Sequence, residues 1–258
     1  MSEFAITRLE IQETALTIAA ERQFVAAAVE AAKSARRDIE RQIRKDRFFL
    51  TTLEPYDIKS CTSEVTSRMC MATRLAGVGP MAAVAGAIAH AALEAMVVEG
   101  STQAWVDNGG DIALILETPA TIEIFTAPGA DKAYAFNLRG TDGIMGICSS
   151  SGRLGHSISF GNSDIALAIA DDAVVADAFA TALGNRIRDK DSLACCFDIF
   201  RGVSAVKGGL AMIDGSVAMY GGVPDLVEVE HNPDRLTLHS VMSSSKFTGS
   251  RTSHQVRA

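Results

Sequence analysis

Residues 146–183 read GICSSSGRLGHSISFGNSDIALAIADDAVVADAFATAL. This segment joins a small-residue turn, a histidine, an apolar strand and a helix that begins with two acidic residues. Most polar residues of the chain that have no evident role in a scaffold lie here. We therefore expect a functional site, if the chain has one, to be built from this segment.

The predicted helix carries Asp177 and Thr181, which are four residues apart and so share one face. Their oxygens suit a hard divalent cation such as Mg²⁺, with carbonyls, waters or phosphate oxygens completing the shell. In the alternative interpretation, Thr181 bonds back to the carbonyl of Asp177 and the carboxylate faces water; spacing alone favours that alternative. Asp171 and Asp172 fit the start of the helix as a cap and a charge that favours its dipole.

The turn after the predicted strand IMGI contains Ser150, Ser151 and Gly152. Such a turn presents N–H groups and hydroxyls to phosphate or carboxylate oxygens, or it is an ordinary turn, and composition does not decide between the two. His156 is the best candidate for proton transfer or phosphate binding, and Arg153 supplies a positive charge to a phosphate. A serine nucleophile is disfavoured because no GxSxG motif or triad is present.

Further upstream, the sequence DNGGDIALIL places Gly109 and Gly110 between two apolar runs. Asn-Gly and Gly-Gly provide the positive φ angles of a tight hairpin, which explains the glycines without any function. Asp107 and Asp111 flank the turn as two carboxylates in an apolar context, where they repel each other unless a cation or hydrogen-bond donors lie between them. Turn capping and ligand contact are equally good interpretations of this pair.

Hydrophobic periodicity predicts the other elements. Strands or hairpins are expected over residues 4–18, 103–106, 121–127, 132–138, 208–221 and 225–230, and helices over residues 19–49, 63–77, 80–100 and 189–201. His90 lies in the apolar helix after Pro80, where a core role is favoured over a functional one.

A weak internal echo relates two parts of the chain. Residues 75–98 and 148–187 share an order of strand, small-residue turn and apolar helix, which indicates two similar halves. Residues 231–258 show no sustained period, so much of this tail is expected to be a loosely held extension.

The composition is that of a globular protein with a substantial core, since 48% of the 258 residues are hydrophobic and 21% are charged. The net charge of −7 argues against nucleic acid or an anionic membrane as a partner. The N-terminus shows no basic-then-apolar leader, and the apolar segment after Pro80 is too rich in Ala and Gly to be a convincing membrane span. A cytoplasmic protein is the simplest interpretation.

Five cysteines, at positions 61, 70, 148, 195 and 196, are scattered without CxxC spacing or a nearby histidine pair. Neither a zinc site nor a disulfide framework is indicated, so reduced thiols in the core are expected. Cys148 beside His156 is conceivable as a nucleophile, but a cysteine that ends an apolar strand is commonly buried.

Four blocks, in this order, carry a resemblance: GVGPMAAVAGAIA (77–89), DNGGDIAL (107–114), GICSSSGRLGHSISFGNSD (146–164) and ADAFATALGN (176–185). They look like the motifs of an uncharacterised prokaryotic family placed in the ApbE-like superfamily. The resemblance covers roughly residues 5–230. The founding members of the superfamily are flavin transferases, which attach FMN from FAD to a protein threonine with the help of Mg²⁺, and the resemblance to these is much thinner.

The resemblance implies roles residue by residue. The glycine-rich GGD turn of the superfamily matches Gly109, Gly110 and Asp111, its small-residue turn resembles Ser150, Ser151 and Gly152, the histidine after it resembles His156, and its metal-binding segment matches Ala176, Asp177, Ala180 and Thr181. A backbone carbonyl near residues 79–82 would also meet the metal. The metal interpretation of Asp177 and Thr181 thereby gains over the structural one.

Three departures separate this chain from the flavin transferases. These enzymes carry a lysine-glycine pair where this chain has GPMAAVAG, they have a proline-glycine loop after the histidine where this chain has SISFGNSD, and they are commonly exported lipoproteins. Transfer of FMN to protein is therefore the least supported part of the resemblance.

The resemblance implies an α+β fold in residues 1–230, a duplication of two sheet-and-helix halves (1–118 and 119–230) related to the tunnelling fold, with the site in the cleft between them. We expect a protein that binds a small phosphorylated ligand, with FAD or FMN as candidates, and Mg²⁺, as a transferase or hydrolase. The alternatives are a cofactor carrier that lost the chemistry, and a homo-oligomeric structural protein without a ligand.

Overall fold

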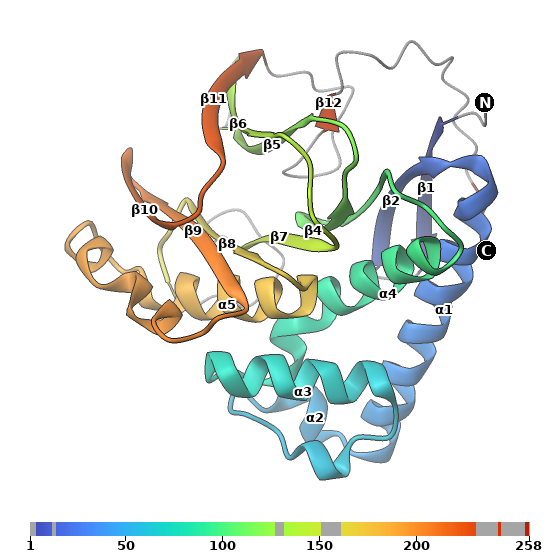
Figure 1. Cartoon of the computed structure of the whole chain (residues 1–258). Coiled ribbons are helices and arrows are strands. Elements are labelled where there is room, and N and C mark those ends of the chain that lie inside the picture. The colour runs from blue at the N-terminus through green and yellow to red at the C-terminus, as the bar shows by residue number, and fades with distance from the viewer. Residues whose placement is uncertain are drawn as a thin grey trace.

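The computed structural model describes residues 4–11, 14–126, 132–150, 161–230, 242–243 and 256–257. These residues form three layers, in which a large sheet lies between a layer of helices and a smaller sheet (Figure 1). The prediction of an α+β fold is confirmed.

The large sheet has nine strands in the order β10-β9-β8-β7-β4-β3-β2-β1-β13. Neighbouring strands are antiparallel, except that β13 runs parallel to β1. The strands are β1 (Phe4–Ile11), β2 (Thr14–Glu21), β3 (Ala104–Asn108), β4 (Asp111–Ile115), β7 (Met145–Ser150), β8 (Ile165–Ala170), β9 (Val206–Ile213), β10 (Ser216–Gly221) and β13 (Val256–Arg257).

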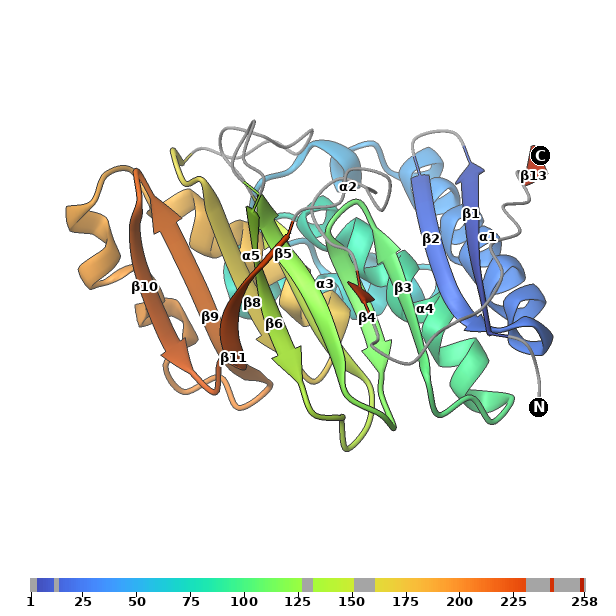
Figure 2. The same cartoon turned by 90° about the horizontal axis from the view of Figure 1, so that it is seen from above.

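The small sheet covers one face of the large sheet (Figure 2). It has the order β11-β6-β5-β12, with β5 (Ala120–Thr126), β6 (Lys132–Leu138), β11 (Asp225–Glu230) and β12 (Met242–Ser243). Phe136 of β6 packs in one apolar cluster with Leu114 of β4 and Ile147 of β7. Because side chains alternate along a strand, the neighbouring residues of the large sheet, such as Ala113 of β4 and Cys148 of β7, face the helices.

The helix layer covers the other face. Helices α1 (Arg22–Lys45), α4 (Val84–Val98) and α5 (Ala173–Arg186) pack on the sheet, and α3 (Glu64–Ala76) packs against these helices from outside (Figure 1). Shorter elements are α2 (Phe48–Thr51) and the 3-10 helices η1 (Ile58–Ser60), η2 (Pro80–Ala83), η3 (Asp191–Ala194) and η4 (Cys196–Phe200).

Helix α4 is apolar on nearly all sides because neighbours surround it. It contacts α1 and α5 in the helix layer and β3 and β4 of the sheet. The segment Pro80–Val98 is nevertheless long and apolar enough to cross a membrane, although its Ala and Gly content led us to expect an unconvincing span. Half of its most apolar window is buried inside the fold. Packing within this protein accounts for its apolar character.

Three predicted helices differ in the structure. The helix expected over residues 80–100 begins as the 3-10 helix η2 and is α-helical only from Val84 to Val98. The helix expected over residues 19–49 begins at Arg22, because Ala19 and Ala20 are still paired in β2, and it ends at Lys45. The helix expected over residues 189–201 is two 3-10 helices, which meet at Cys195, a residue with φ −132° and ψ 4°. The hairpin that turns at Asp214 and Gly215 forms as predicted.

The order of elements repeats along the chain. A hairpin (β1-β2), helices and a second hairpin (β3-β4) are followed by a hairpin (β7-β8), helix α5 and another hairpin (β9-β10). Strands β4 and β7 join the two series within one sheet. The predicted echo is wrong in its first copy, because residues 75–98 contain the end of α3, η2 and α4 but no strand. The duplication at residues 1–118 and 119–230 stays a prediction.

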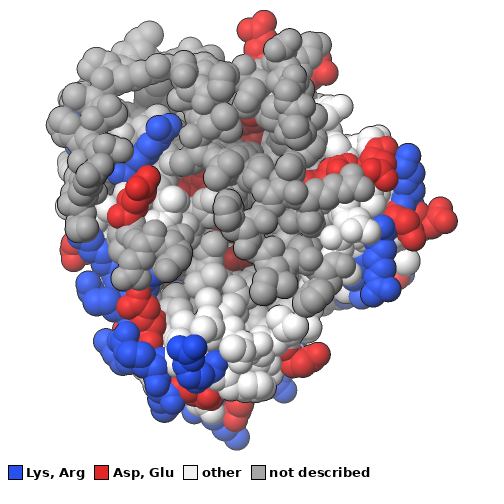
Figure 3. All heavy atoms as spheres, turned by 180° about the vertical axis from the view of Figure 1, so that it is seen from behind, with Lys and Arg blue, Asp and Glu red and all other residues white. Residues whose placement is uncertain are grey.

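Surface charge is mixed on the face seen in Figure 3. Among the described residues visible there, Lys and Arg side chains lie interspersed with Asp and Glu, without a broad area of one sign. Helix α1 shows the same mixture, since Arg36 and Arg44 both pair with Glu40. Arg41 likewise pairs with Asp38, so ion pairs of opposite charges lie along this helix.

Candidate functional site

Three of the predicted site residues lie on the sheet face that the helices cover. Asp111 at the start of β4 is directly opposite Cys148 of β7. Ser150 follows two residues later on β7 and therefore shares the face of Cys148. Asp177 lies in α5, which packs on β7 and β8 at this face. The fold thus brings together Asp111, Ser150 and Asp177 from three elements.

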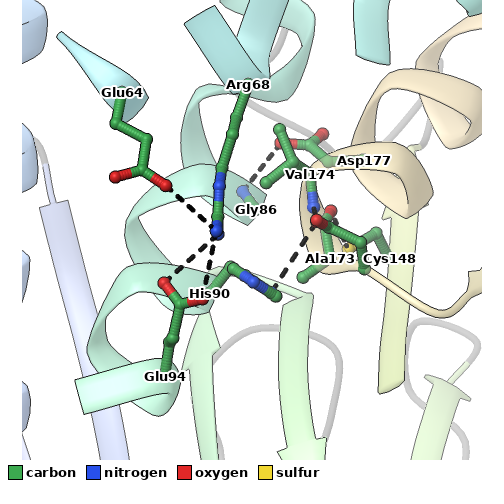
Figure 4. Close-up of polar contacts among 10 residues, drawn as sticks. Glu64, Arg68, Gly86, His90, Glu94, Cys148, Ala173, Val174 and Asp177 are labelled. Atoms are coloured by element: carbon green, nitrogen blue, oxygen red, sulfur yellow. Dashed lines mark hydrogen bonds and ion pairs between the residues drawn. The ribbon is translucent and has the colours of Figure 1, made fainter. Parts of the chain in front are cut away.

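Asp177 is bound to the first turn of α4. Its Oδ2 accepts a hydrogen bond of 2.8 Å from the backbone N–H of Gly86 (Figure 4). The first amides of a helix have no partner inside the helix, so the carboxylate satisfies them and favours the positive end of the dipole. Asp177 is buried, and the interpretation in which its carboxylate faces water is wrong.

Gly86 makes this contact possible because it has no side chain. A Cβ there would lie 2.7 Å from the Cβ of Asp177 and would overlap the carbonyl oxygen of Ala173. Helices α4 and α5 therefore cross at a glycine, with backbone against backbone.

Burial and repulsion raise the pKa values of the site carboxyls above those of ordinary aspartates. Burial raises the pKa of Asp177 from 3.8 to about 7, against the lowering effect of the two helix amides. Burial also raises the pKa of Asp111 well above its ordinary value, and the negative charges of Asp177 and Asp107 raise it further. The site is thus a low-dielectric position with an excess of negative charge.

The two acidic residues that flank the turn between β3 and β4 have different environments. Gly109 and Gly110 have φ of 69° and 101°, as the predicted hairpin requires. Asp107 caps the turn, since its Oδ1 accepts a hydrogen bond of 2.8 Å from the N–H of Gly110. Asp111 is different: its Oδ1 is buried and has no hydrogen-bond partner among the described residues. Turn capping therefore explains Asp107, and the unpartnered oxygen of Asp111 is available to a ligand.

The small-residue turn is described only at its start. Ser149 donates a hydrogen bond of 3.3 Å to the carbonyl of Gly110, which links β7 to the glycine turn. The hydroxyl of Ser150 is buried without a partner among the described residues. The other predicted residues, Ser151, Gly152, Arg153 and His156, lie outside the described residues.

The donors present fit a hard cation. Thr181 is half-buried and lies one helical turn from Asp177 on the same face of α5. The 3-10 helix η2, which overlaps the segment 79–82 expected to offer a backbone carbonyl to a metal, packs against α5. The unpartnered Oδ1 of Asp111 is a further oxygen donor. In the described part of the chain, no three His, Cys, Asp or Glu side chains form a metal cluster, so hydroxyl, carbonyl or water oxygens would have to complete the shell.

A second polar cluster supports the same helices from outside (Figure 4). Arg68 of α3 forms a two-bond contact with Glu94 of α4, at 3.1 and 3.2 Å, and also pairs with Glu64. His90 is buried, as the sequence predicts, but its Nδ1 has no hydrogen-bond partner among the described residues and lies 3.7 Å from Oδ1 of Asp172. Asp172 caps α5 as predicted, because that oxygen accepts a 2.6 Å hydrogen bond from the N–H of Val174. Of these contacts, the one between Arg68 and Glu94 joins two helices, α3 and α4.

Two contributors to the site escaped prediction. The amide of Gly86 carries no side-chain signal, although a helix start after Pro80 always offers unpaired N–H groups. Asn108 was read only as a turn residue, yet its Nδ2 donates a hydrogen bond of 3.1 Å to the carbonyl of Ala85 and fixes the turn to α4.

Fold and site together define an ApbE-like α+β protein. The family model described as AbpE bacteria matches residues 2–196. A UPF0280 protein of Methanocella arvoryzae is 42% identical over 230 residues, covering 89% of this chain and 94% of the relative. A UPF0280 protein of Archaeoglobus fulgidus is 41% identical over 235 residues, covering 89% and 97%. The chain belongs to this UPF0280 family of ApbE-like proteins, as the resemblance predicts.

Solved structures show the same fold at low identity. The apo flavinyl transferase ApbE of Pseudomonas stutzeri has a TM-score of 0.50 and 12% identity, covering 85% of this chain and 95% of that chain. The ApbE protein of Thermotoga maritima has a TM-score of 0.52 and 11% identity, covering 84% and 97%. At these identities the likeness concerns the fold alone.

Proposed function

We propose that this protein binds a flavin nucleotide together with Mg²⁺, the cation being held by Asp177 and Thr181. The observation that carries the proposal is the pair of buried carboxyls, Asp111 and Asp177, whose pKa values are raised and one of whose oxygens has no partner among the described residues. A buried acidic pair next to an unpartnered hydroxyl, that of Ser150, is stabilised by a cation and its oxygen-rich ligand. The flavin part of the proposal is supported by the family and by the flavinyl transferase named among the similar structures.

Each residue then has a separate task. Asp177 is positioned by the α4 amides and supplies a carboxylate oxygen to the cation, and Thr181 supplies a hydroxyl. Gly109, Gly110 and Ser150 would contact phosphate oxygens, and Asp111 would bind either a cation-bound water or, when protonated, a ligand oxygen. When bound, Mg²⁺ neutralises phosphate charge and polarises a phosphoryl oxygen. Arg153 and His156 are assigned to phosphate binding and proton transfer from the sequence.

Transfer or hydrolysis is the first form of the proposal, and a cofactor carrier is the second. The helix entry GPMAAVAG has no lysine, and this departure from the flavin transferases favours a carrier. The presence of Asp177, Thr181 and His156 favours an enzyme. The cytoplasmic location and a homo-oligomeric state stay predictions.

Calorimetry with FAD, FMN and ADP, each with and without Mg²⁺, tests the binding. We expect FAD binding that depends on Mg²⁺, and a loss of at least about tenfold in that affinity for Asp177→Asn, since even the outer partners of metal ligands cost this much. Asp225→Asn is the matched control, because this carboxylate is exposed on β11 of the small sheet. Nucleotide binding that is absent, or unaffected by Asp177→Asn, would overturn the proposal.

Mass detection of released FMN or AMP separates the two forms once binding is seen. An enzyme releases product in the presence of Mg²⁺, and His156→Ala lowers the rate while leaving FAD binding in place. Equal and negligible release by the wild type and the variant identifies the carrier.

A further inference from the structure

Two cysteines far from the candidate site have their sulfur atoms in contact. The Sγ atoms of Cys61 and Cys70 are 3.0 Å apart, while both residues are free thiols. Cys61 directly follows η1, and Cys70 lies on the buried face of α3. A disulfide needs about 2.05 Å between the sulfurs, so a side-chain movement of about 1 Å would join them.

The two thiols differ in exposure and environment. Cys61 is half-buried, and its Sγ donates a 3.4 Å hydrogen bond to the carbonyl of Thr66. Cys70 is only 1% exposed. Burial, and then the neighbouring Cys61 sulfur, raise the pKa of Cys70 above its ordinary value. A soluble reagent therefore reaches Cys61 first, and Cys70 is reactive mainly towards Cys61.

We propose that Cys61 and Cys70 form a reversible intramolecular disulfide by exchange with a low-molecular-weight disulfide. The Cys61 thiolate attacks one sulfur of the reagent, and the other sulfur leaves and takes up a proton. Cys70 then loses its proton and attacks Sγ of Cys61, which releases the second half of the reagent as a thiol. In total, two protein thiols are oxidised to one disulfide and one reagent disulfide is reduced to two thiols.

The bond would fasten a connecting segment to the helix layer. Between the two cysteines lies the start of α3, where Ser63 and Thr66 form a reciprocal cap. Gln42 of α1 already holds this segment through hydrogen bonds with the Ser60 carbonyl and the Thr62 hydroxyl. A disulfide would replace the sulfur contact by a covalent link between η1 and α3, independently of ligand binding at Asp177.

Incubation of the full chain with oxidised glutathione tests the exchange. After digestion without reduction, mass spectrometry should find one peptide pair joined through Cys61 and Cys70, and neither of these two thiols should be alkylated in the unfolded protein. Both changes should reverse with a reducing agent. A product in which glutathione stays on Cys61 while Cys70 is still alkylated would overturn the proposal, as would five free thiols at equilibrium.

Three variants make the result specific. In Cys70→Ala, glutathione should remain on Cys61, because the second thiol is gone, and in Cys61→Ala the linked peptide should be lost. Cys195→Ala is the matched control, since it alters the other neighbouring cysteine pair, and it should leave the linked peptide unchanged. A disulfide between Cys70 and a different cysteine in Cys61→Ala would contradict the assignment of Cys61 as the partner of Cys70.

Thermal unfolding measures what the bond does. Closing this short loop should raise the Tm of the oxidised wild type by about 5 °C over the reduced protein, and Cys61→Ala should show no such difference. An oxidised wild type with an unchanged Tm would contradict the fastening of η1 to α3.

Discussion

Asp177 is expected to make the ligand-free protein less stable as pH rises. Its pKa is about 7 in the folded protein, against an ordinary value of 3.8, so the folded state binds more protons between these values. Stability is therefore lost between about pH 4 and pH 7, by about 4 kcal/mol for this group, and changes no further above pH 7. Urea unfolding at several pH values, without divalent cations, measures the slope.

Asp177→Asn isolates the contribution of this group. The amide keeps the shape and an oxygen to accept the Gly86 N–H, but it does not titrate. The variant should be similar to the wild type near pH 4 and more stable than it above pH 7. Equal slopes for the two proteins would show that burial does not raise this pKa.

At the residue scale, spacing alone identified the polar groups but not their environments. The four-residue interval of Asp177 and Thr181 predicts a shared helix face, and the glycines between Asp107 and Asp111 predict a turn. Neither pattern shows that one oxygen of Asp177 is held by Gly86, which is 91 residues away. Burial of a carboxylate arises from tertiary packing, so the sequence could not separate capping from ligand contact.

At the element scale, the crossing of α4 and α5 depends on Gly86. We expect Gly86→Ala to lower the free energy of unfolding by about 2 to 4 kcal/mol, because a Cβ there meets the backbone of α5 and the Cβ of Asp177. Gly143→Ala is the matched control, since nothing lies within 4 Å of its added Cβ, and it should change stability by less than about 1 kcal/mol. Urea unfolding at pH 7 measures both.

The same variant tests the position of Asp177. If the helices move apart to accept the methyl group, Mg²⁺-dependent ligand binding weakens in Gly86→Ala and is unchanged in Gly143→Ala. A Gly86→Ala protein as stable as the wild type would contradict the close crossing.

Turn chemistry predicted elements better than helical periodicity did. The hairpins at Asn108–Gly110 and at Asp214–Gly215 form as expected, because positive φ is a local requirement. The start of α1 was misplaced, since Ala19 and Ala20 suit a helix but pair in β2. Alanine is common in helices, yet strand pairing overrides this preference where the sheet needs small residues.

At the scale of the whole molecule, the two sheets are held together by one apolar layer. We expect Phe136→Ala to lower the free energy of unfolding by about 3 to 5 kcal/mol, because this fully buried ring lies between the sheets. Tyr134→Ala, on the same strand but 41% exposed, should cost much less. Unfolding followed by fluorescence of the single Trp105 and by circular dichroism should change in one step for both variants.

The class of the fold was predictable, but the strand order was not. Alternating apolar residues identify strands β5 and β6, yet alternation does not state which sheet a strand joins. The internal echo predicted a strand within residues 75–98, but this segment is helical, and no local pattern predicted that β4 pairs with β7. Strands β6 and β11 lie side by side in the small sheet because residues 132–138 pair with residues 225–230. No local sequence pattern predicts this long-range pairing.

The hydrogen bond between Gly86 and Asp177 also has a consequence for biosynthesis. The N-terminal half of a growing chain reaches β4 long before α5 emerges, so the Gly86 amide of α4 must wait for a partner encoded 91 residues downstream. Contacts of such sequence separation form late. If the proposed site binds its ligand, a nascent chain that stops before residue 177 lacks the carboxylate that holds α4, so binding begins only after α5 has been made.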